Sequence, residues 1–204
     1  MVRPVFVILI TLAACGMLVN EARALDPHVR DGWILGLAYG GATGDITFST
    51  GVEGEVEDGV SPQIRFGHML GRKFAVGVAY VGWMYETGNV PVKYRFSLQN
   101  VLLNGTWYPG HPESALGGMH VRLGVGYAWS AIAEVELEEG EEQGHGDRHV
   151  DKGLGFELNL GYEFRVYRTT AVGLGIGVVA QSLDGDLYKD TVYTPVTLNL
   201  SWYW

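Results

Sequence analysis

The stretch TLNLSWYW, residues 197–204, ends the chain. Read with a period of two residues, it separates into a polar face and an apolar face. The apolar face carries Leu198, Leu200, Trp202 and Trp204. Such alternation is typical of a β-strand with one greasy side. The last residues of a soluble domain are usually polar and poorly ordered, so an aromatic strand reaching the final residue indicates an unusual setting for that strand.

Composition favours one folded domain built from strands. The chain has 204 residues, of which 47% are hydrophobic and 18% charged, which is too apolar for a disordered protein. Its 30 glycines follow no collagen period and indicate crowded backbone packing. We find no long apolar stripe with a helical period of 3.6 residues, so helix is not expected.

The first 24 residues have the pattern of a secretory signal peptide. Arg3 precedes an apolar run from Val5 to Val19, and the small-residue pattern Ala22-Arg23-Ala24 follows. A membrane anchor is the competing interpretation, but the run falls short of the roughly 20 residues that span a bilayer. We therefore predict a signal peptide over residues 1–24 and one mature domain over residues 25–204.

Cys15 allows a second interpretation of this segment. Leu12-Ala13-Ala14-Cys15 resembles a bacterial lipobox, in which Cys15 would be acylated and become the mature N-terminus. The alternative, which we favour, is that Cys15 is a small apolar residue of the signal core, because the apolar run continues past it to a better cleavage site. Both interpretations predict export from the cytoplasm.

The cysteine content excludes disulfides from the mature domain, and the net charge disfavours some classes of binding partner. Cys15 is the single cysteine, so a domain cleaved after Ala24 has no disulfide framework. The formal net charge is −9. An acidic exported protein is a poor candidate for binding nucleic acid or anionic lipid surfaces.

Period-two segments recur through the mature chain and predict about eight strands. They cover residues 32–40, 62–70, 74–83, 93–108, 119–129, 154–164, 172–178 and 196–204. In the fourth segment the apolar phase slips between Leu98 and Val101, which predicts a β-bulge near Gln99 or Asn100. In the fifth segment, the alternation continues from Trp129 to Leu137. That strand is therefore expected to be longer than the others and, if the strands cross a membrane, to extend beyond it.

The connections between these segments alternate in length. Short or moderate ones fall near residues 71–73, 109–118 and 166–169. Longer polar connections cover roughly residues 41–61, 84–92, 134–152 and 181–192. We therefore expect short turns to gather at one end of the sheet and long loops at the other.

Two architectures fit eight antiparallel strands in an exported protein: a soluble calyx with apolar residues inside, and an outer-membrane barrel with apolar residues outside. The second face of the fifth and seventh segments is mostly Gly and Ala, which suits a crowded interior better than a solvated exterior. Aromatic residues lie near both ends of the apolar faces, as at bilayer interfaces. We predict an all-β fold, an eight-stranded antiparallel transmembrane up-and-down β-barrel with a lipid-facing apolar exterior, short periplasmic turns and longer extracellular loops.

Charges of both signs fall on the Gly-rich face. They are Arg65, Arg95, Arg122, Glu157, Glu163 and Arg165. Opposite charges in a narrow lumen can pair, whereas unpaired burial costs several kcal/mol per ion. We interpret them as an interior charge network; the alternative is a set of solvated charges on a soluble sheet.

The GWILGL opening strand at residues 32–37, the eight alternating segments and the aromatic end after Leu200 and Trp202 carry a family resemblance. The chain resembles the small eight-stranded outer-membrane β-barrels of Gram-negative bacteria, the opacity-protein and OmpA transmembrane-domain type. The resemblance implies location in the cell outer membrane. It also implies that the closing strand is the signal read by the barrel-assembly machinery, through Leu198, Leu200, Trp202 and Trp204. Unlike OmpA, no peptidoglycan-binding domain is expected after that strand.

Residues 134–152 form the most unusual connection in composition, with eight acidic residues and two histidines. Carboxylates and imidazoles are ligands for divalent ions, but the spacing matches neither an EF-hand loop nor a zinc motif. We interpret the segment as a solvated acidic loop and assign no metal. Weak cation bridging to neighbouring lipopolysaccharide is the alternative.

The residues leave three functions open. The first is a structural or surface-interaction role, with a lumen filled by inward groups such as Tyr203 and Arg122. The second is a narrow porin-like passage or small-ligand site, if the Gly-rich strands leave a groove. The third is a lipid A-modifying enzyme, but His120 is expected to face inward without a Ser at strand spacing. We predict the first, with no catalytic residue or cofactor and with outer-membrane lipid and lipopolysaccharide as partners. The extracellular partner and oligomeric state stay open.

Overall fold

The computed structural model describes residues 30–48, 50–51, 53–89, 92–111, 114, 116–138, 141–143, 151–185 and 188–204. The predicted signal peptide and its cleavage site lie outside these residues. The strands are β1 (Trp33–Phe48), β2 (Glu53–Gly71), β3 (Phe74–Asn89), β4 (Val92–Trp107), β5 (Met119–Glu138), β6 (Glu141–Gln143), β7 (Lys152–Tyr167), β8 (Thr170–Asp184) and β9 (Tyr188–Tyr203).

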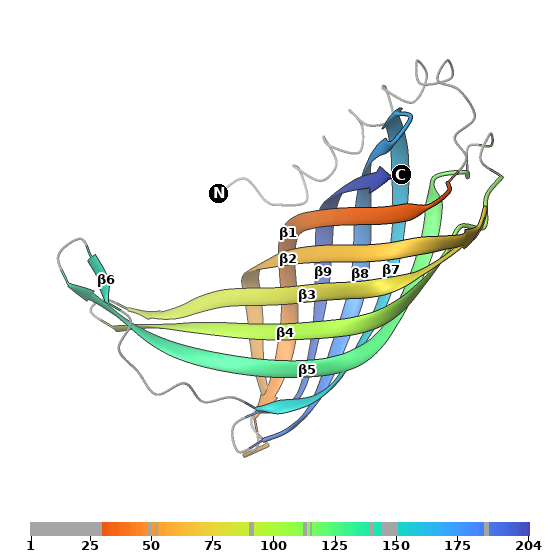
Figure 1. The fold of residues 1–204 in the computed structure, drawn as a ribbon. Coiled ribbons are helices and arrows are strands. Elements are labelled where there is room, and N and C mark those ends of the chain that lie inside the picture. The colour runs from red at the N-terminus through yellow and green to blue at the C-terminus, as the bar shows by residue number, and fades with distance from the viewer. Residues whose placement is uncertain are drawn as a thin grey trace.

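Eight of these strands close into a barrel (Figure 1). Neighbouring strands pair antiparallel, β4 pairs with β5, and β1 pairs with both β2 and β9, so the sheet has no free edge along the closed part. The three-residue β6 pairs only with the end of β5. The predicted eight-stranded up-and-down barrel is confirmed.

The two ends of the barrel differ. The terminal end holds Arg30, Trp204, the turns at 72–73 and 168–169 and the described residues between β4 and β5, whereas the hairpin end holds the last residues of β1, β3, β5 and β8 and the first residues of β2, β4, β7 and β9. The backbone of Trp33 exchanges two hydrogen bonds with that of Trp204, at 2.7 and 3.1 Å, which closes the β1–β9 seam at the terminal end.

Three of the connections expected to be long loops are mostly strand. β1 continues to Phe48 and β2 begins at Glu53, so most of residues 41–61 pair as a hairpin, and residues 84–92 and 181–192 behave alike. Polar residues hid these strands because beyond a membrane the outer face meets water and loses its apolar signature. The predicted extension of the fifth strand is confirmed, since β5 reaches Glu138.

The bulge predicted near Gln99 or Asn100 is wrong. β4 pairs without a register shift with both β3 and β5. Phe96 and Leu98 face the lumen, whereas Val101 and Leu103 face outward. The apolar phase changes because the interior becomes apolar toward the hairpin end, not because the strand slips.

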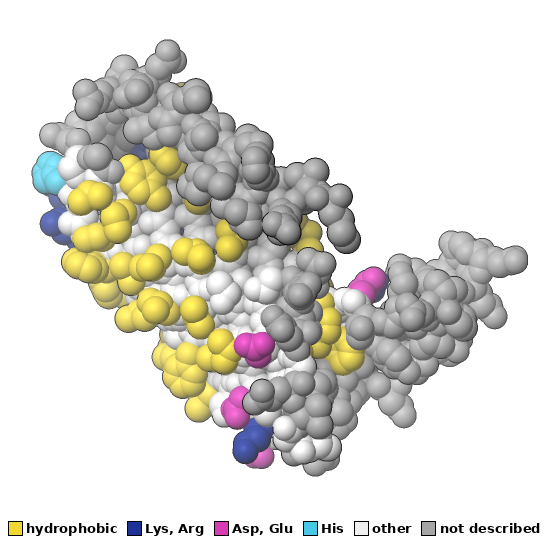
Figure 2. Space-filling view, turned by 180° about the vertical axis from the view of Figure 1, so that it is seen from behind, with side chains coloured by type: hydrophobic (Ala, Val, Ile, Leu, Met, Phe, Trp, Pro, Cys, Tyr) yellow, Lys and Arg dark blue, Asp and Glu magenta, His cyan; other side chains and the backbone are white. Residues whose placement is uncertain are grey.

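The outer face of the barrel is an apolar band. Leu37, Ile64, Leu103, Leu123 and Leu198 are each at least 41% exposed although they lie in the middle of strands. Figure 2 shows such side chains across the middle of the wall, with charges toward its ends. A soluble monomer rarely exposes so large an apolar surface, so this band is a lipid-facing exterior.

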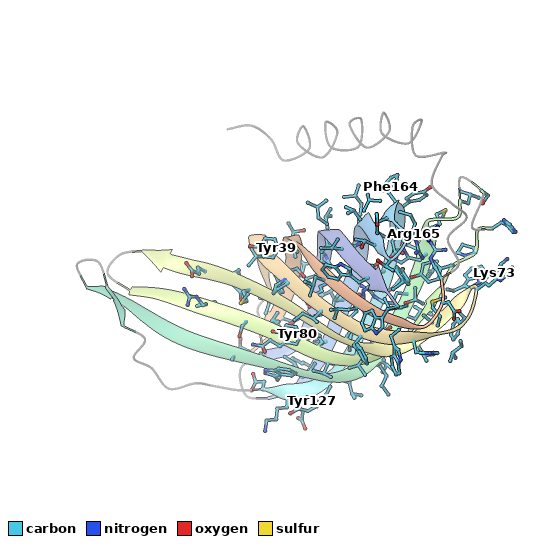
Figure 3. The ribbon with its side chains drawn as sticks, turned by 45° about the horizontal axis from the view of Figure 1, so that its top comes forward. Tyr39, Lys73, Tyr80, Tyr127, Phe164 and Arg165 are labelled. Carbon is cyan, nitrogen blue, oxygen red and sulfur yellow. The ribbon has the colours of Figure 1, made fainter. Side chains whose placement is uncertain are left out.

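Aromatic rings border the band on both sides, as in membrane-spanning barrels. Figure 3 places Tyr39, Tyr80 and Tyr127 toward the hairpin end and Phe164 toward the terminal end. At the terminal side Trp33 stacks on Phe66 with ring centroids 5.1 Å apart. Within the described residues, no helix is long and apolar enough to span a membrane.

Candidate functional site: the filled lumen

Inward-facing side chains fill the barrel in successive sections from the terminal end to the hairpin end. The first three sections are polar and the last is apolar. Each inward residue alternates with an outward-facing neighbour, because successive side chains of a strand point to opposite faces.

Glu163 on β7 centres the section nearest the terminal end. Its carboxylate accepts hydrogen bonds from the hydroxyls of Ser201, at 3.0 Å, and Tyr203, at 2.5 Å, both on β9. Arg65 of β2 places Nη2 3.8 Å from Oε1, and Arg30 places Nε 3.9 Å from Oε2. The cluster thus connects strands on both sides of the β1–β9 seam.

Two tyrosines and two arginines close the mouth beside this cluster. The hydroxyls of Tyr108 and Tyr203 are 3.2 Å apart. The Arg30 guanidinium lies 4.0 Å from the Tyr108 ring centroid and that of Arg165 lies 4.1 Å from the Tyr203 centroid. Burial raises the pKa of Tyr108, which follows the end of β4, so this phenol stays protonated. Arg30 also donates from Nη2 to the Gly117 carbonyl at 2.7 Å.

Arg122 and Glu157 form the second section. Arg122 Nη2 lies 2.6 Å from Glu157 Oε1, and Arg122 Nε donates to both carboxylate oxygens at 3.2 Å. Arg122 Nη2 also donates to Gln63 Oε1 at 3.1 Å. Both charged groups are almost fully buried, so the pair is sheltered from the screening that weakens surface ion pairs.

Asn100 centres the third section. Its amide nitrogen donates to the Tyr193 hydroxyl at 3.2 Å and to the Val81 carbonyl at 3.3 Å, and its amide oxygen accepts from Gln181 Nε2 at 3.1 Å. These bonds cross the lumen between β4, β8 and β9. Asn100, Gln181 and Tyr193 are all buried.

An aromatic stack fills the hairpin half of the interior. Trp83 stacks on Tyr193 with ring centroids 4.9 Å apart and contacts Tyr85 at 5.2 Å, and Tyr85 stacks on Phe96 at 4.8 Å. Ile46, Val81, Leu98, Leu102, Val179 and Leu183 are buried in the same cluster. We call this section the aromatic plug.

The Gly-rich inner face makes room for the lumen side chains. A Cβ at Gly155 would overlap the Asn100 amide, and a Cβ at Gly161 would overlap the His120 ring. Of the two alternatives for this face, a groove or space for bulky groups, the structure has the second at both positions.

Arg95 corrects the predicted interior network. It lies on the outer face of β4 and pairs with Glu86 of β3 at 2.7 Å, with both side chains more than 40% exposed. At this level the outer face meets water, so the apolar residues of β4 turn inward and its charged residue turns outward. The structure places Arg65, Arg122, Glu157 and Glu163 in the lumen, and Arg165 at its terminal rim.

Several lumen residues escaped sequence reasoning. Arg30 precedes the first strand, Tyr108 follows the fourth, and Trp83 lies at the end of a segment read as lipid-facing. The available signal was the even or odd register of each strand: Trp83 shares its phase with the inward Ala75 and Ala79.

Neither His120 nor a metal-binding group forms a chemical site among the described residues. His120 faces inward and is buried, and neither ring nitrogen has a hydrogen-bond partner among the described residues. No group of His, Cys, Asp or Glu suited to a metal occurs among those residues. Much of the acidic segment 134–152, including both histidines, lies outside them.

No known protein family matches the chain, and no curated protein matches it in sequence. Solved structures do match. Neisserial surface protein A has a TM-score of 0.55 and 13% identity, covering 85% of this chain and 97% of that one. The attachment invasion locus protein Ail of Yersinia pestis has a TM-score of 0.53 and 10% identity, covering 85% and 99%. Ail in complex with the heparin analogue sucrose octasulfate matches with a TM-score of 0.52 and 10% identity, over the same shares. These likenesses show that the chain has the fold of small eight-stranded membrane barrels.

Proposed function

We propose that this chain is an integral outer-membrane β-barrel protein with a structural or surface-interaction role and a closed lumen. The filled lumen carries the proposal: the Glu163 cluster, the Arg122–Glu157 pair, the Asn100 cluster and the aromatic plug follow one another along the barrel. Eight-stranded barrels are just wide enough for side chains to fill, and this one uses bulky side chains at every level.

The proposed orientation has the terminal end in the periplasm and the hairpin end outside the cell. Short turns face the periplasm and longer connections face outward in bacterial barrels, and the extended hairpins of β3, β4 and β5 fit the outer side (Figure 1). Outer-membrane lipid and lipopolysaccharide are the proposed partners of the apolar band, and the barrel-assembly machinery of the closing strand.

A surface role would be performed at the acidic hairpin end. Residues 41–61, 84–92, 134–152 and 181–192 carry 17 of the 23 acidic residues and 3 of the 14 basic ones. Ail has been crystallised with a sulfated heparin analogue, but like charges repel, so a polyanion is not our proposal for this chain. A basic partner, or divalent cations bridging to lipopolysaccharide, suits this end.

Single-channel recording in a planar bilayer tests the closed lumen. Purified full-length protein should give no steady openings. A Trp83→Ala and Arg122→Ala double variant, which removes a plug side chain and a polar-section side chain, serves as the comparison. Steady, voltage-independent openings of the unmodified protein would instead establish the narrow passage, the second candidate.

The enzymatic candidate has its own test. Lipid A from cells with and without the protein is compared by mass spectrometry, and we expect identical masses. A protein-dependent gain or loss of an acyl chain would establish a lipid A-modifying enzyme. His120→Ala serves as the control, because His120 is the buried histidine that such an enzyme would need as its base.

A further inference from the structure

The terminal mouth of the lumen carries more positive than negative charge. Arg30 and Arg65 lie within 4 Å of the Glu163 carboxylate, and Arg165 stacks on Tyr203, whose hydroxyl donates to the same carboxylate. Glu157, the carboxylate of the neighbouring section, is matched with Arg122. Two guanidinium charges therefore have no carboxylate of their own in this part of the chain.

Two of these guanidinium groups also have unused donors. Arg30 Nε and Arg165 Nη2 are buried and have no hydrogen-bond acceptor among the described residues; Arg30 Nε lies 3.9 Å from Glu163, beyond hydrogen-bond distance. A buried donor left unpaired is costly, and more so when it belongs to a charged group. A hydrogen-bond acceptor near Arg30 Nε and Arg165 Nη2 would remove this cost.

The two unused donors flank the same place. Arg30 stacks on Tyr108 and Arg165 stacks on Tyr203, and the two tyrosine hydroxyls are 3.2 Å apart. Stacking occupies the faces of the guanidinium planes and leaves their N–H edges for in-plane acceptors. Arg165 is held in this position by donating from Nη1 to the Arg168 carbonyl at 3.2 Å.

The surroundings of the mouth would attract an anion. Arg72, Lys73 and Arg168 are exposed on the turns of the terminal end, where Asp31 is the exposed acidic residue among those described, and Figure 3 shows Lys73 and Arg165 at that end. Clustered charge of one sign raises the local concentration of the opposite ion. This positive end contrasts with the acidic hairpin end of the same molecule.

We propose that the terminal mouth binds one small oxyanion of the phosphate class between Arg30 and Arg165. A tetrahedral oxyanion has several acceptor oxygens and can receive the unused donors of both guanidinium groups at once. It would also supply the missing negative charge. The site is independent of the proposed surface role, because it lies at the opposite end of the barrel.

Calorimetric titration of the full-length barrel with inorganic phosphate tests the site. The protein is held in zwitterionic lipid nanodiscs at low salt, and we expect one saturable site. Arg165→Gln should weaken binding at least tenfold. Lys73→Gln, which removes an exposed cation from the same end, should leave it within twofold. Absence of saturable binding, or an equal loss in both variants, would overturn the proposal.

A second measurement does not depend on variants that fold. The unfolding temperature of the unmodified protein is compared in phosphate and in chloride at equal ionic strength. Specific binding should raise the temperature only in phosphate, whereas equal shifts would show an adventitious ionic effect and overturn the site. Adding anionic lipid to the nanodiscs then identifies the source: unchanged phosphate affinity assigns the site to a free anion, and competition assigns it to a lipid phosphate.

Discussion

Individual residues decide how closely the lumen can pack. Gly59 of β2 lies against the indole of Trp83, and a Cβ there would overlap Trp83 Nε1. Trp83 is fully buried between Gly59 and the Tyr193 ring, so it has no free space to move into. A hydrogen in place of a methyl group thus permits the aromatic plug at this position.

We expect Gly59→Ala to lower the free energy of unfolding by about 1–3 kcal/mol, the usual cost of forcing extra atoms into a packed interior. Reversible urea unfolding in detergent or lipid measures it. The matched control is Gly71→Ala, where a Cβ would meet nothing within 4 Å, and a change below about 0.5 kcal/mol is expected. Equal costs at the two glycines would contradict the overlap with Trp83.

The two ion pairs of opposite exposure give a second prediction. Glu157→Gln leaves Arg122 charged and buried without its partner, and we expect a loss of about 3–5 kcal/mol. Arg95→Ala breaks an exposed pair and should cost less than about 1 kcal/mol. Replacing Arg122 and Glu157 together by Met should recover much of the loss. A double variant as unstable as Glu157→Gln would refute this account of the pair.

At the scale of elements, β4 records where the membrane ends. Its outward positions run from the charged Arg95 through Ser97 and Gln99 to the apolar Val101 and Leu103. Leu103 is 68% exposed, which is sustainable because its surroundings are lipid. The polar-to-apolar change along this face of β4 therefore marks the edge of the apolar band nearest the hairpin end.

A lysine placed along this face should measure that limit. Leu103→Lys is expected to destabilise the folded barrel by about 2–4 kcal/mol and Ser97→Lys by about 0–1 kcal/mol, because the cost of charge falls from the bilayer centre to its surface. Unfolding in lipid vesicles provides the values. Equal costs at both positions would mean that the band is not in lipid.

The closing strand β9 determines whether the barrel forms. Deleting Trp204 removes two backbone hydrogen bonds to Trp33, and we expect a several-fold lower amount of heat-modifiable barrel in the outer membrane. Trp204→Ala keeps both bonds and removes only the ring. A loss in the deletion alone assigns the effect to closure, and a loss in both assigns it to recognition of the aromatic end; normal amounts in both would contradict an assembly role.

The two ends of the barrel carry opposite charge. Its hairpin end is acidic, its terminal end carries exposed Arg72, Lys73 and Arg168, and the apolar band separates them. Such a molecule has one stable way to lie in an asymmetric membrane once it is inserted, because neither charged end can cross the apolar layer cheaply. Orientation is therefore a property that can be tested directly.

Cysteine labelling tests orientation with little interference, since Cys15 is the single cysteine and precedes the predicted cleavage site. Asp184→Cys at the hairpin end should react with a membrane-impermeant maleimide on intact cells. Lys73→Cys at the terminal end should react only after the outer membrane is permeabilised. The reverse pattern would invert the proposed topology, and both residues are exposed, so access is not limited by burial.

The sequence by itself determined the barrel, because the alternation of lipid-facing and lumen-facing residues is a local property of each strand. Trp33 to Tyr39 and Val196 to Trp202 show their outward faces without reference to any partner. Strands that face lipid can be recognised from the sequence in this way, because lipid accepts only apolar side chains.

Only the tertiary structure decided which side chains meet within the lumen. That Arg95 faces water, that Arg30 from outside the strands reaches Glu163, and that Trp83 stacks on Tyr193 all depend on how strands far apart in sequence meet across the closed barrel. Alternation with a period of two separates the two faces of a strand but does not show what each face contacts. Along β4 the surroundings of the outer face change from lipid to water. Closure brings these partners together, and closure is a property of the whole sheet.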